Sequence, residues 1–564
     1  MNNTCHHCNQ PFEIEQDELD FIDKISPAFA GKKYLFGLPT LCPWCRLRRR
    51  LAWRNERYLY KRKCDLSGKE IISIYPPDSP FKIYDKELWW SDKVDNMQYG
   101  RDFDFSRPFF EQFNELLLAV PRMALIGSNN ENCDYASYIS GCKDCYMSFV
   151  VYYASQNVHY SNWAFGCTDC IDIYLCHTSE LLYECVQCKS CYNCSYCLNC
   201  TGCSDCLFSA QLKNCSNCLF SNNLVNKKFH IFNKPYSEKE YFSYLQNLDL
   251  GSHKNTGKNI ETWKKMMNSM VVRDMQLVSC EDSVGENLWR CKNSKYIFDC
   301  TDSENCKYYL GSSDVINSQH GIGGQVEWTY EISNCGIGGS NYCFCSSAIN
   351  CSNILYCENC YNCNDCFGCA GLKNKKFCIF NKQYSQAEYE KLAAQIIGHM
   401  KKNSSGAGQA GEYGEFYPMS MSPFAFNKSL AAQIMPLNKE EALKLGAYWR
   451  DDEKAAVTPI NLKENLLADS INEIESVPAD AQPCMNCGSA YRILPMELAF
   501  YKKKQLPLPR YCLNCRHEMR TQISHGYKFY DRTCAKCTGP IKTTYAPERP
   551  ETVYCESCYL KEIY

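Results

Sequence analysis

Cysteine stands at every third position from Cys185 to Cys206, in the run CVQCKSCYNCSYCLNCTGCSDC. This period matches neither a flat strand, which repeats every 2 residues, nor an α-helix, which repeats every 3.6. Directly afterwards, CLFSAQLKNCSN from Cys206 is followed by the similar CLFSNNLVNKKF from Cys218. A twelve-residue repeat supplies about the chain that one coil of a narrow solenoid needs, at roughly 3.3 Å per residue. The run therefore predicts a stack of short, repetitive coils.

The same pattern returns further along the chain. Cys218 to Tyr241 aligns without a gap on Cys366 to Tyr389, and Tyr183-Glu184 matches Tyr330-Glu331. We therefore expect two copies of one solenoid with capping helices, at 130–279 and 280–401. In both copies a serine, Ser237 or Ser385, begins the helix after the sequence IFNK.

The net charge, the cysteine count and the lack of long apolar runs limit the kinds of protein that this chain can be. The chain has 564 residues, 43 cysteines and a formal net charge of −2, so any nucleic-acid or membrane partner needs a local patch. The first residues lack the basic and apolar segments of a leader peptide, and no apolar run is long enough to span a bilayer. We expect a soluble cytoplasmic protein, in which many cysteines indicate metal ligands or buried free thiols instead of disulfides.

Paired CxxC spacings at both ends of the chain predict metal sites. Each pair places two thiolates on one turn, so that two pairs surround one tetrahedral ion. Three complete quartets predict about three structural zinc ions, with these ligands: Cys5, Cys8, Cys42 and Cys45; Cys484, Cys487, Cys512 and Cys515; Cys534, Cys537, Cys555 and Cys558.

The N-terminal module has lost a second metal site. Shifting the chain by 470 places Cys64 on Cys534, but Ser67, Asp85 and Leu88 then stand opposite Cys537, Cys555 and Cys558. Leucine cannot bind zinc and serine binds it poorly. We expect packing by aromatic side chains to replace this metal.

A basic segment follows the second N-terminal cysteine pair. Positive charges interleaved with aromatic rings suit phosphate contacts and base stacking, and the alternative is a solvated helix beside the zinc knuckle. The residues predicted for nucleic-acid binding are Arg46, Arg48, Arg49, Arg50, Trp53, Arg54, Arg57, Tyr58, Tyr60, Lys61, Arg62 and Lys63.

The expected fold is mainly β. It consists of the duplicated cysteine-rich β-solenoid, of the right-handed β-helix type with short capping helices, between zinc-ribbon or treble-clef-like modules. The expected segments are an N-terminal module (1–92), a helical connector (93–129) with an amphipathic helix over 106–122, the two solenoid copies, a flexible linker (402–416), a small helical segment and linker (417–480), and a C-terminal double zinc ribbon (481–564).

Three interpretations of the 30 central cysteines remain open. They fill a narrow interior as small apolar side chains, they bind a soft metal, or they hold an iron–sulfur cluster. The ferredoxin spacing is absent, which argues against the cluster. The sequence also lacks GxSxG, P-loop, GxGxxG and HExxH motifs, so we expect neither an enzyme nor a small-molecule substrate.

The chain resembles a family over essentially its whole length. The segments LPTLCPWCRLRRRLAWRNERYLYKRKCDL, GRDFDFSRPFFEQFNELLLAVPR, CFGCAGLKNKKFCIFNKQYS and CAKCTGPIKTTYAPERPETVYCESCYLKEIY are similar to large cysteine-rich proteins of small-genome uncultured bacteria, for which no activity is established. Some members carry a CaiB/BaiF acyl-CoA transferase label, which these residues do not support. In that family the positions of Ser67, Asp85 and Leu88 are usually cysteine.

Three functional hypotheses follow. The first is a cytoplasmic, non-enzymatic, zinc-binding scaffold with an unidentified protein partner. The second is an RNA-binding or ribosome-associated factor that uses the N-terminal basic module, and the third is a thiol-rich metal or redox store.

Overall fold

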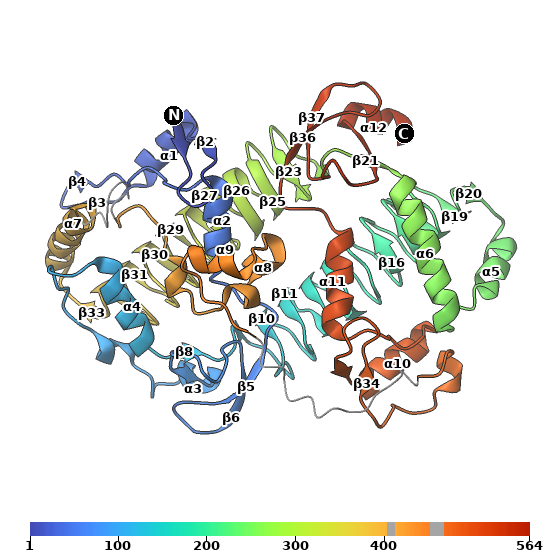
Figure 1. Ribbon diagram of the computed structural model, residues 1–564, viewed down its shortest axis with the longest axis horizontal. Coiled ribbons are helices and arrows are strands. Elements are labelled where there is room, and N and C mark those ends of the chain that lie inside the picture. Colours follow the sequence, from blue (N-terminus) through green and yellow to red (C-terminus); the bar gives the residue numbers. More distant parts are fainter. Residues whose placement is uncertain (403–411, 452–466, 564) are drawn as a thin grey trace. The chain divides into compact units, whose positions relative to one another are not determined.

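The computed structural model describes residues 1–402, 412–451 and 467–563 (Figure 1). Strands make up 30% and helices 24% of it, so the fold is mixed instead of mainly β. Two compact units divide the chain. Unit 1 contains 1–125 and 275–451, and unit 2 contains 126–274 with the described part of 452–564. The N-terminal module therefore shares a unit with the second cysteine-rich copy, and the C-terminal module shares one with the first.

The first copy forms a ladder of short parallel strands in unit 2, named here ladder 1 (residues 127–235). Each strand pairs with the segment about twelve residues further on, as Ser195 does with Leu207, and only the last pair is antiparallel. The strands of ladder 1 are β9 (Gly127–Ser128), β10 (Ser137–Ser140), β11 (Phe149–Tyr152), β12 (Gln156–His159), β13 (Asn162–Phe165), β14 (Thr168–Ile171), β15 (Tyr174–His177), β16 (Ser195–Leu198), β17 (Leu207–Ala210), β18 (Ser216–Leu219), β19 (Lys228–Ile231) and β20 (Lys234–Pro235).

The second copy forms a similar ladder in unit 1, named ladder 2 (residues 277–383). Its strands are also parallel apart from the last pair, and they are longer at the centre of the ladder. They are β22 (Leu277–Val278), β23 (Val284–Glu286), β24 (Leu288–Trp289), β25 (Lys295–Thr301), β26 (Glu304–Ser313), β27 (Ile316–Ile322), β28 (Glu327–Tyr330), β29 (Gly339–Cys343), β30 (Cys351–Leu355), β31 (Asn364–Phe367), β32 (Lys376–Ile379) and β33 (Lys382–Gln383).

A left-handed residue at every third position sets the geometry of ladder 1. From Asp169 to Phe232, each third residue has a φ between 46° and 64°. A left-handed residue turns the chain sharply, and Asn and Asp tolerate this conformation better than other non-glycine residues. Asn193, Asn199 and Asn217 are examples of asparagines at these corners.

The cysteines lie inside these ladders. Each of them except Cys343 follows a left-handed residue, and every cysteine from Cys142 to Cys218 and from Cys291 to Cys378 is buried. Their thiols have acceptors at regular positions, since Cys185 Sγ donates to the carbonyl oxygens of Tyr183 at 3.4 Å and Cys194 at 3.6 Å. The central cysteines therefore form the cores of the two ladders, as the first of the three interpretations predicts.

Helices cover the ends and sides of the ladders. The predicted amphipathic helix is α4 (Phe109–Ala119), and the serine-capped helices are α5 (Glu238–Asn247) and α7 (Gln386–Lys402). Helices α5 and α7 pack on β19 and β32 at the ladder ends, and α6 (His253–Ser269) packs along ladder 1 (Figure 1). As predicted, Ser237 begins α5, where it forms a capping box with Glu240.

The N-terminal module consists of short hairpins and helices. Its elements are β1 (Asn2–Thr4), β2 (Pro11–Glu13), α1 (Gln16–Ile25), β3 (Ala28–Phe29), β4 (Lys32–Lys33), α2 (Pro43–Leu51), β5 (Tyr60–Lys63), β6 (Glu70–Ser73), β7 (Ile83–Tyr84) and α3 (Lys86–Trp90). The turn η1 (Asn96–Tyr99), helix α4 and strand β8 (Arg122–Met123) complete this part of unit 1, with β8 parallel to β7.

The C-terminal module repeats this order of elements. It contains β34 (Gln482–Pro483), β35 (Ala490–Tyr491), α10 (Pro495–Lys504), α11 (Leu513–Ile523), β36 (Tyr530–Thr533), β37 (Pro540–Thr543), β38 (Thr552–Tyr554) and α12 (Glu556–Ile563). Strand β21 (Val271–Arg273) runs parallel to β38, as β8 does to β7. The two modules therefore share a fold and join their units in the same way.

The segment between ladder 2 and the C-terminal module is partly described. Residues 403–411 of the predicted linker 402–416, and 452–466 of the predicted segment 417–480, lie outside the described residues. The described part has η2 (Met419–Met421), η3 (Phe426–Lys428), α8 (Leu430–Ile434), α9 (Lys439–Lys444) and η4 (Ile471–Glu473). Helix α9 lies in the predicted helical segment, and Asn438 and Glu441 form a capping box at its start.

The left-handed corners predict a specific pattern of stability. Asn199 is a partly exposed corner with a φ of 53°. Asn199→Val should lower the thermal unfolding midpoint, because a β-branched residue is strained there by about 1–2 kcal/mol, whereas Asn199→Gly should change it little. Equal midpoints for the two variants would contradict a structural role for this corner.

Candidate metal centres

Three groups of four cysteines have the geometry of tetrahedral sulfur sites. The Sγ atoms within each group all lie within 4.8 Å of one another, and the groups are the three quartets predicted from the sequence. Four sulfur atoms at about 2.3 Å from a tetrahedral ion are separated by about 3.8 Å. The observed separations are 3.8 Å for Cys8–Cys42, 3.7 Å for Cys487–Cys512 and 3.8 Å for Cys537–Cys555. Each group could hold one metal ion.

A hairpin and a helix start bring each quartet together. Cys5 and Cys8 lie in the loop between β1 and β2, and Cys42 is the residue before α2. Cys484 and Cys512 occupy the same places beside β34 and α11. Pro43 favours the start of α2, since its missing N–H has no partner to lose in the first turn.

Backbone amides stabilise the thiolates in these groups. The N–H of Cys512 donates to Cys484 Sγ at 3.2 Å, and that of Cys555 donates to Cys534 Sγ at 3.3 Å. Burial alone would raise the pKa of Cys484 and Cys534, but backbone donors lower both to about 6. A thiolate is the form of cysteine that binds a metal, so both residues are prepared as ligands.

The lost site of the N-terminal module keeps the backbone of a metal knuckle. The N–H groups of Ser67 and Asp85 donate to Cys64 Sγ at 3.5 and 3.3 Å. Asp85, in the place of a ligand, instead caps α3 by accepting N–H bonds from Glu87 and Leu88. As expected, aromatic packing occupies the region, since Trp89 is fully buried and its indole N–H donates to the carbonyl of Pro121 at 2.9 Å.

This difference predicts unequal effects of matched substitutions. Cys555→Ser should remove one metal ion and unfold the local ribbon, because a structural zinc supplies on the order of 10 kcal/mol to a small module. Asp85→Ala, at the equivalent of Cys555, should cost only about 1 kcal/mol through the lost helix cap and leave the metal content unchanged. Limited proteolysis and elemental analysis measure both outcomes, and equal protease sensitivity of the two variants would contradict the loss of this site.

The basic segment 46–63 is mostly buried, which corrects the expectation of an accessible basic surface. Only Lys61 and Lys63 are exposed, while Arg48, Tyr58 and Tyr60 are partly exposed. The buried members are Arg46, Arg49, Arg50, Trp53, Arg54, Arg57 and Arg62. Most of these arginines are held by ion pairs inside unit 1, so they are not available to phosphate groups.

Glu331 of ladder 2 is the centre of these ion pairs. Arg46 Nε contacts one carboxylate oxygen of Glu331, and Arg50 Nη1 lies 2.7 Å from the other. Arg46 also reaches Glu18 of α1 at 2.9 Å. Burial would raise the pKa of Glu331, but the arginine charges outweigh it and hold this pKa well below its ordinary value. The helix after the metal knuckle is thus fixed to the ladder by buried charges.

The same arrangement recurs independently in unit 2. Arg516 and Arg520 of α11 correspond to Arg46 and Arg50 of α2, and both pair with Asp172 of ladder 1. Arg520 also lies 3.0 Å from Glu184, the counterpart of Glu331. In both units a pair of arginines one helical turn apart therefore joins the metal-binding module to a ladder.

The sequence contains a signal for these ladder carboxylates. Glu184 and Glu331 fall at matching positions of the two copies, and the arginines recur at a shift of 470. The two sets of residues are nevertheless far apart in the chain, and only the pairing of each module with one ladder brings them together.

We predict that the buried ion pairs are essential to unit 1. Glu331→Gln should destabilise it by about 3–5 kcal/mol, because two buried arginines lose their common counter-ion. Lys61→Gln with Lys63→Gln, at exposed positions of the same segment, should change stability by less than about 0.5 kcal/mol. Chemical unfolding measures the stability of both variants. An unchanged unfolding midpoint for Glu331→Gln would contradict the role of the ion pairs.

Comparisons with known proteins do not assign this chain to a family or a function. Neither the protein-family models nor the curated proteins compared with the chain give a match. Within the described parts of the chain, no helix has the length and apolar character required to cross a membrane.

Proposed function

We propose that this protein is a zinc-binding scaffold in which metal-stabilised modules are fixed to two cysteine-filled β-solenoids. The observation that carries this proposal is the grouping of the cysteine sulfurs, which lie within 4.8 Å of one another in each quartet and include one pair at 3.7–3.8 Å in each. Zinc is favoured over other metals because it prefers four sulfur ligands in a tetrahedron and undergoes no redox change.

The solenoid part of the proposal rests on the ladders. Parallel pairing with a register of about twelve residues, together with a corner at every third residue, suits a chain that winds in four short sides. Such stacked coils form an extended surface whose side chains repeat along one direction, which is typical of proteins that hold partners. We therefore favour a scaffold over an enzyme.

The core thiols support a reducing compartment such as the cytoplasm. Cys188, Cys197 and Cys360 donate S–H hydrogen bonds to backbone carbonyls, which only reduced thiols can do. Burial also raises the pKa of Cys176 and Cys343, so these thiols stay protonated and unreactive at neutral pH.

The two other hypotheses receive less support. A thiol-rich metal store would need clustered ligands in the ladders, yet within residues 1–402, 412–451 and 467–563 the only groups of three or more close metal-binding side chains are the terminal quartets. RNA binding through the basic segment would require Arg46 and Arg50 to leave Glu331. We propose neither function.

The proposal predicts the metal content. Purified protein should contain about three zinc ions per chain, one for each quartet, and Cys558→Ser should reduce this to about two. The buried thiols outside the quartets should react with a thiol reagent only after denaturation, whereas the partly exposed Cys133 and Cys280 can react in the folded protein. Elemental analysis and thiol titration test this, and a metal content well above three, lost when ladder cysteines are replaced, would favour the store.

A further inference from the structure

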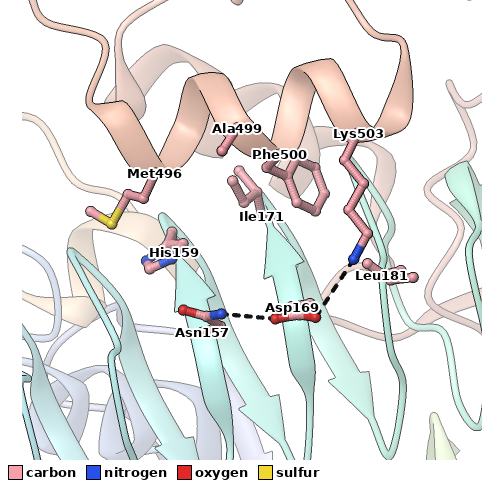
Figure 2. Close-up of a pocket in the computed structure, with 9 residues that line it drawn as sticks. All are labelled: Asn157, His159, Asp169, Ile171, Leu181, Met496, Ala499, Phe500 and Lys503. Atoms are coloured by element: carbon pink, nitrogen blue, oxygen red, sulfur yellow. Dashed lines mark hydrogen bonds and ion pairs between the residues drawn. The ribbon is translucent and has the colours of Figure 1, made fainter.

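A hollow of about 310 Å³ lies in unit 2 between ladder 1 and α10 (Figure 2). Strands β12 and β14 form its floor, and α10 contributes residues at positions 496, 499, 500 and 503, which share one helix face. The residues that line it are Asn157, His159, Asp169, Ile171, Leu181, Met496, Ala499, Phe500 and Lys503.

The corresponding place in unit 1 is occupied by ion pairs. Helix α1 matches α10 at a shift of 479, and Lys307 of ladder 2 matches His159 at a shift of 148. Lys307 Nζ lies 2.7 Å from Glu15 and 3.0 Å from Asp17, and its side chain is only 5% exposed.

Unit 2 has replaced all three members of this ion-pair network. His159 stands in place of Lys307, and Leu494 and Met496 stand in place of Glu15 and Asp17. The shorter imidazole and the apolar helix residues do not rebuild these ion pairs. Unit 2 therefore has a hollow at the position where unit 1 has a filled contact.

The hollow combines two opposite charges with a buried imidazole. Asp169 accepts a hydrogen bond from Asn157 at 2.9 Å and forms an ion pair with Lys503 Nζ at 3.9 Å, a distance too long for a hydrogen bond. His159 is 5% exposed, and its Nδ1 has no hydrogen-bond partner within the described part of the chain. Burial lowers the pKa of His159 to about 4, so the ring is neutral at pH 7.

We propose that this hollow binds a free α-amino acid with an apolar side chain. The ligand ammonium pairs with Asp169, its carboxylate pairs with Lys503, and its side chain lies against Ile171, Leu181 and Phe500. Asp169 and Lys503 form an ion pair that is too long for a hydrogen bond, and a zwitterion can take its place while giving each charge a partner. A ligand with a single charge would displace this ion pair and leave one of its two members without a partner, which costs affinity.

Isothermal titration of the intact, zinc-loaded protein with L-leucine and L-phenylalanine tests this proposal. Both should bind, while isoamylamine and 4-methylpentanoate, which lack the carboxylate and the ammonium respectively, should bind at least about tenfold more weakly. Absence of binding up to about 10 mM amino acid would overturn the proposal, as would equal binding of the amino acids and both single-charge analogues.

Variants locate the site independently of the metal centres. Asp169→Asn and Lys503→Met should each weaken binding about tenfold, whereas Lys561→Met, at an exposed position away from the hollow, should not. The double variant His159→Lys with Met496→Asp rebuilds the ion pair of unit 1. It should abolish binding while the zinc content and the unfolding midpoint are retained, and full binding by this folded variant would refute the site.

Discussion

Both ladders depend on a backbone constraint, the left-handed residue that recurs at every third position. In such a short repeat the interior is narrow and favours small side chains, although the core of ladder 2 also contains Tyr309 and Tyr342. Cysteine meets this requirement and adds an S–H group that bonds to carbonyl oxygens of its own and the next rung. The cysteine repeat is therefore explained by packing and hydrogen bonding, without a metal in the ladder.

Buried ion pairs between arginines of the modules and carboxylates of the ladders hold each module on its ladder, in addition to apolar contacts. In unit 1 the carboxylate of Glu331 faces Arg46, Arg49 and Arg50, and in unit 2 Asp172 and Glu184 have the same role with Arg516 and Arg520. Buried pairs of this kind add little net stability compared with apolar contacts, but they strongly penalise a wrong alignment. They are suited to selecting one docking position along a ladder whose rungs otherwise resemble one another.

Local chemistry was predictable from the sequence, and tertiary pairing was not. The three quartets and the serine cap of α5 follow from spacing and residue type, and the structure has them in the predicted places. The basic segment was misinterpreted because its charge was counted without its geometry. Arg46 and Arg50 are one helical turn apart and so share one face, but their partner Glu331 is 281 residues from Arg50. The hollow beside His159 likewise becomes visible only when α10 is placed on ladder 1.

The pairing of modules and ladders also bears on synthesis. The N-terminal module emerges from the ribosome first, yet its ladder begins only after residue 275, and all of ladder 1 lies between them. At ordinary elongation rates this is a delay on the order of 10 s. During that time Glu331 has not yet been synthesised, so Arg46 and Arg50 lack this ion-pair partner. All four metal ligands Cys5, Cys8, Cys42 and Cys45 have already been synthesised. Early metal capture would thus keep the nascent module folded until its binding surface is made.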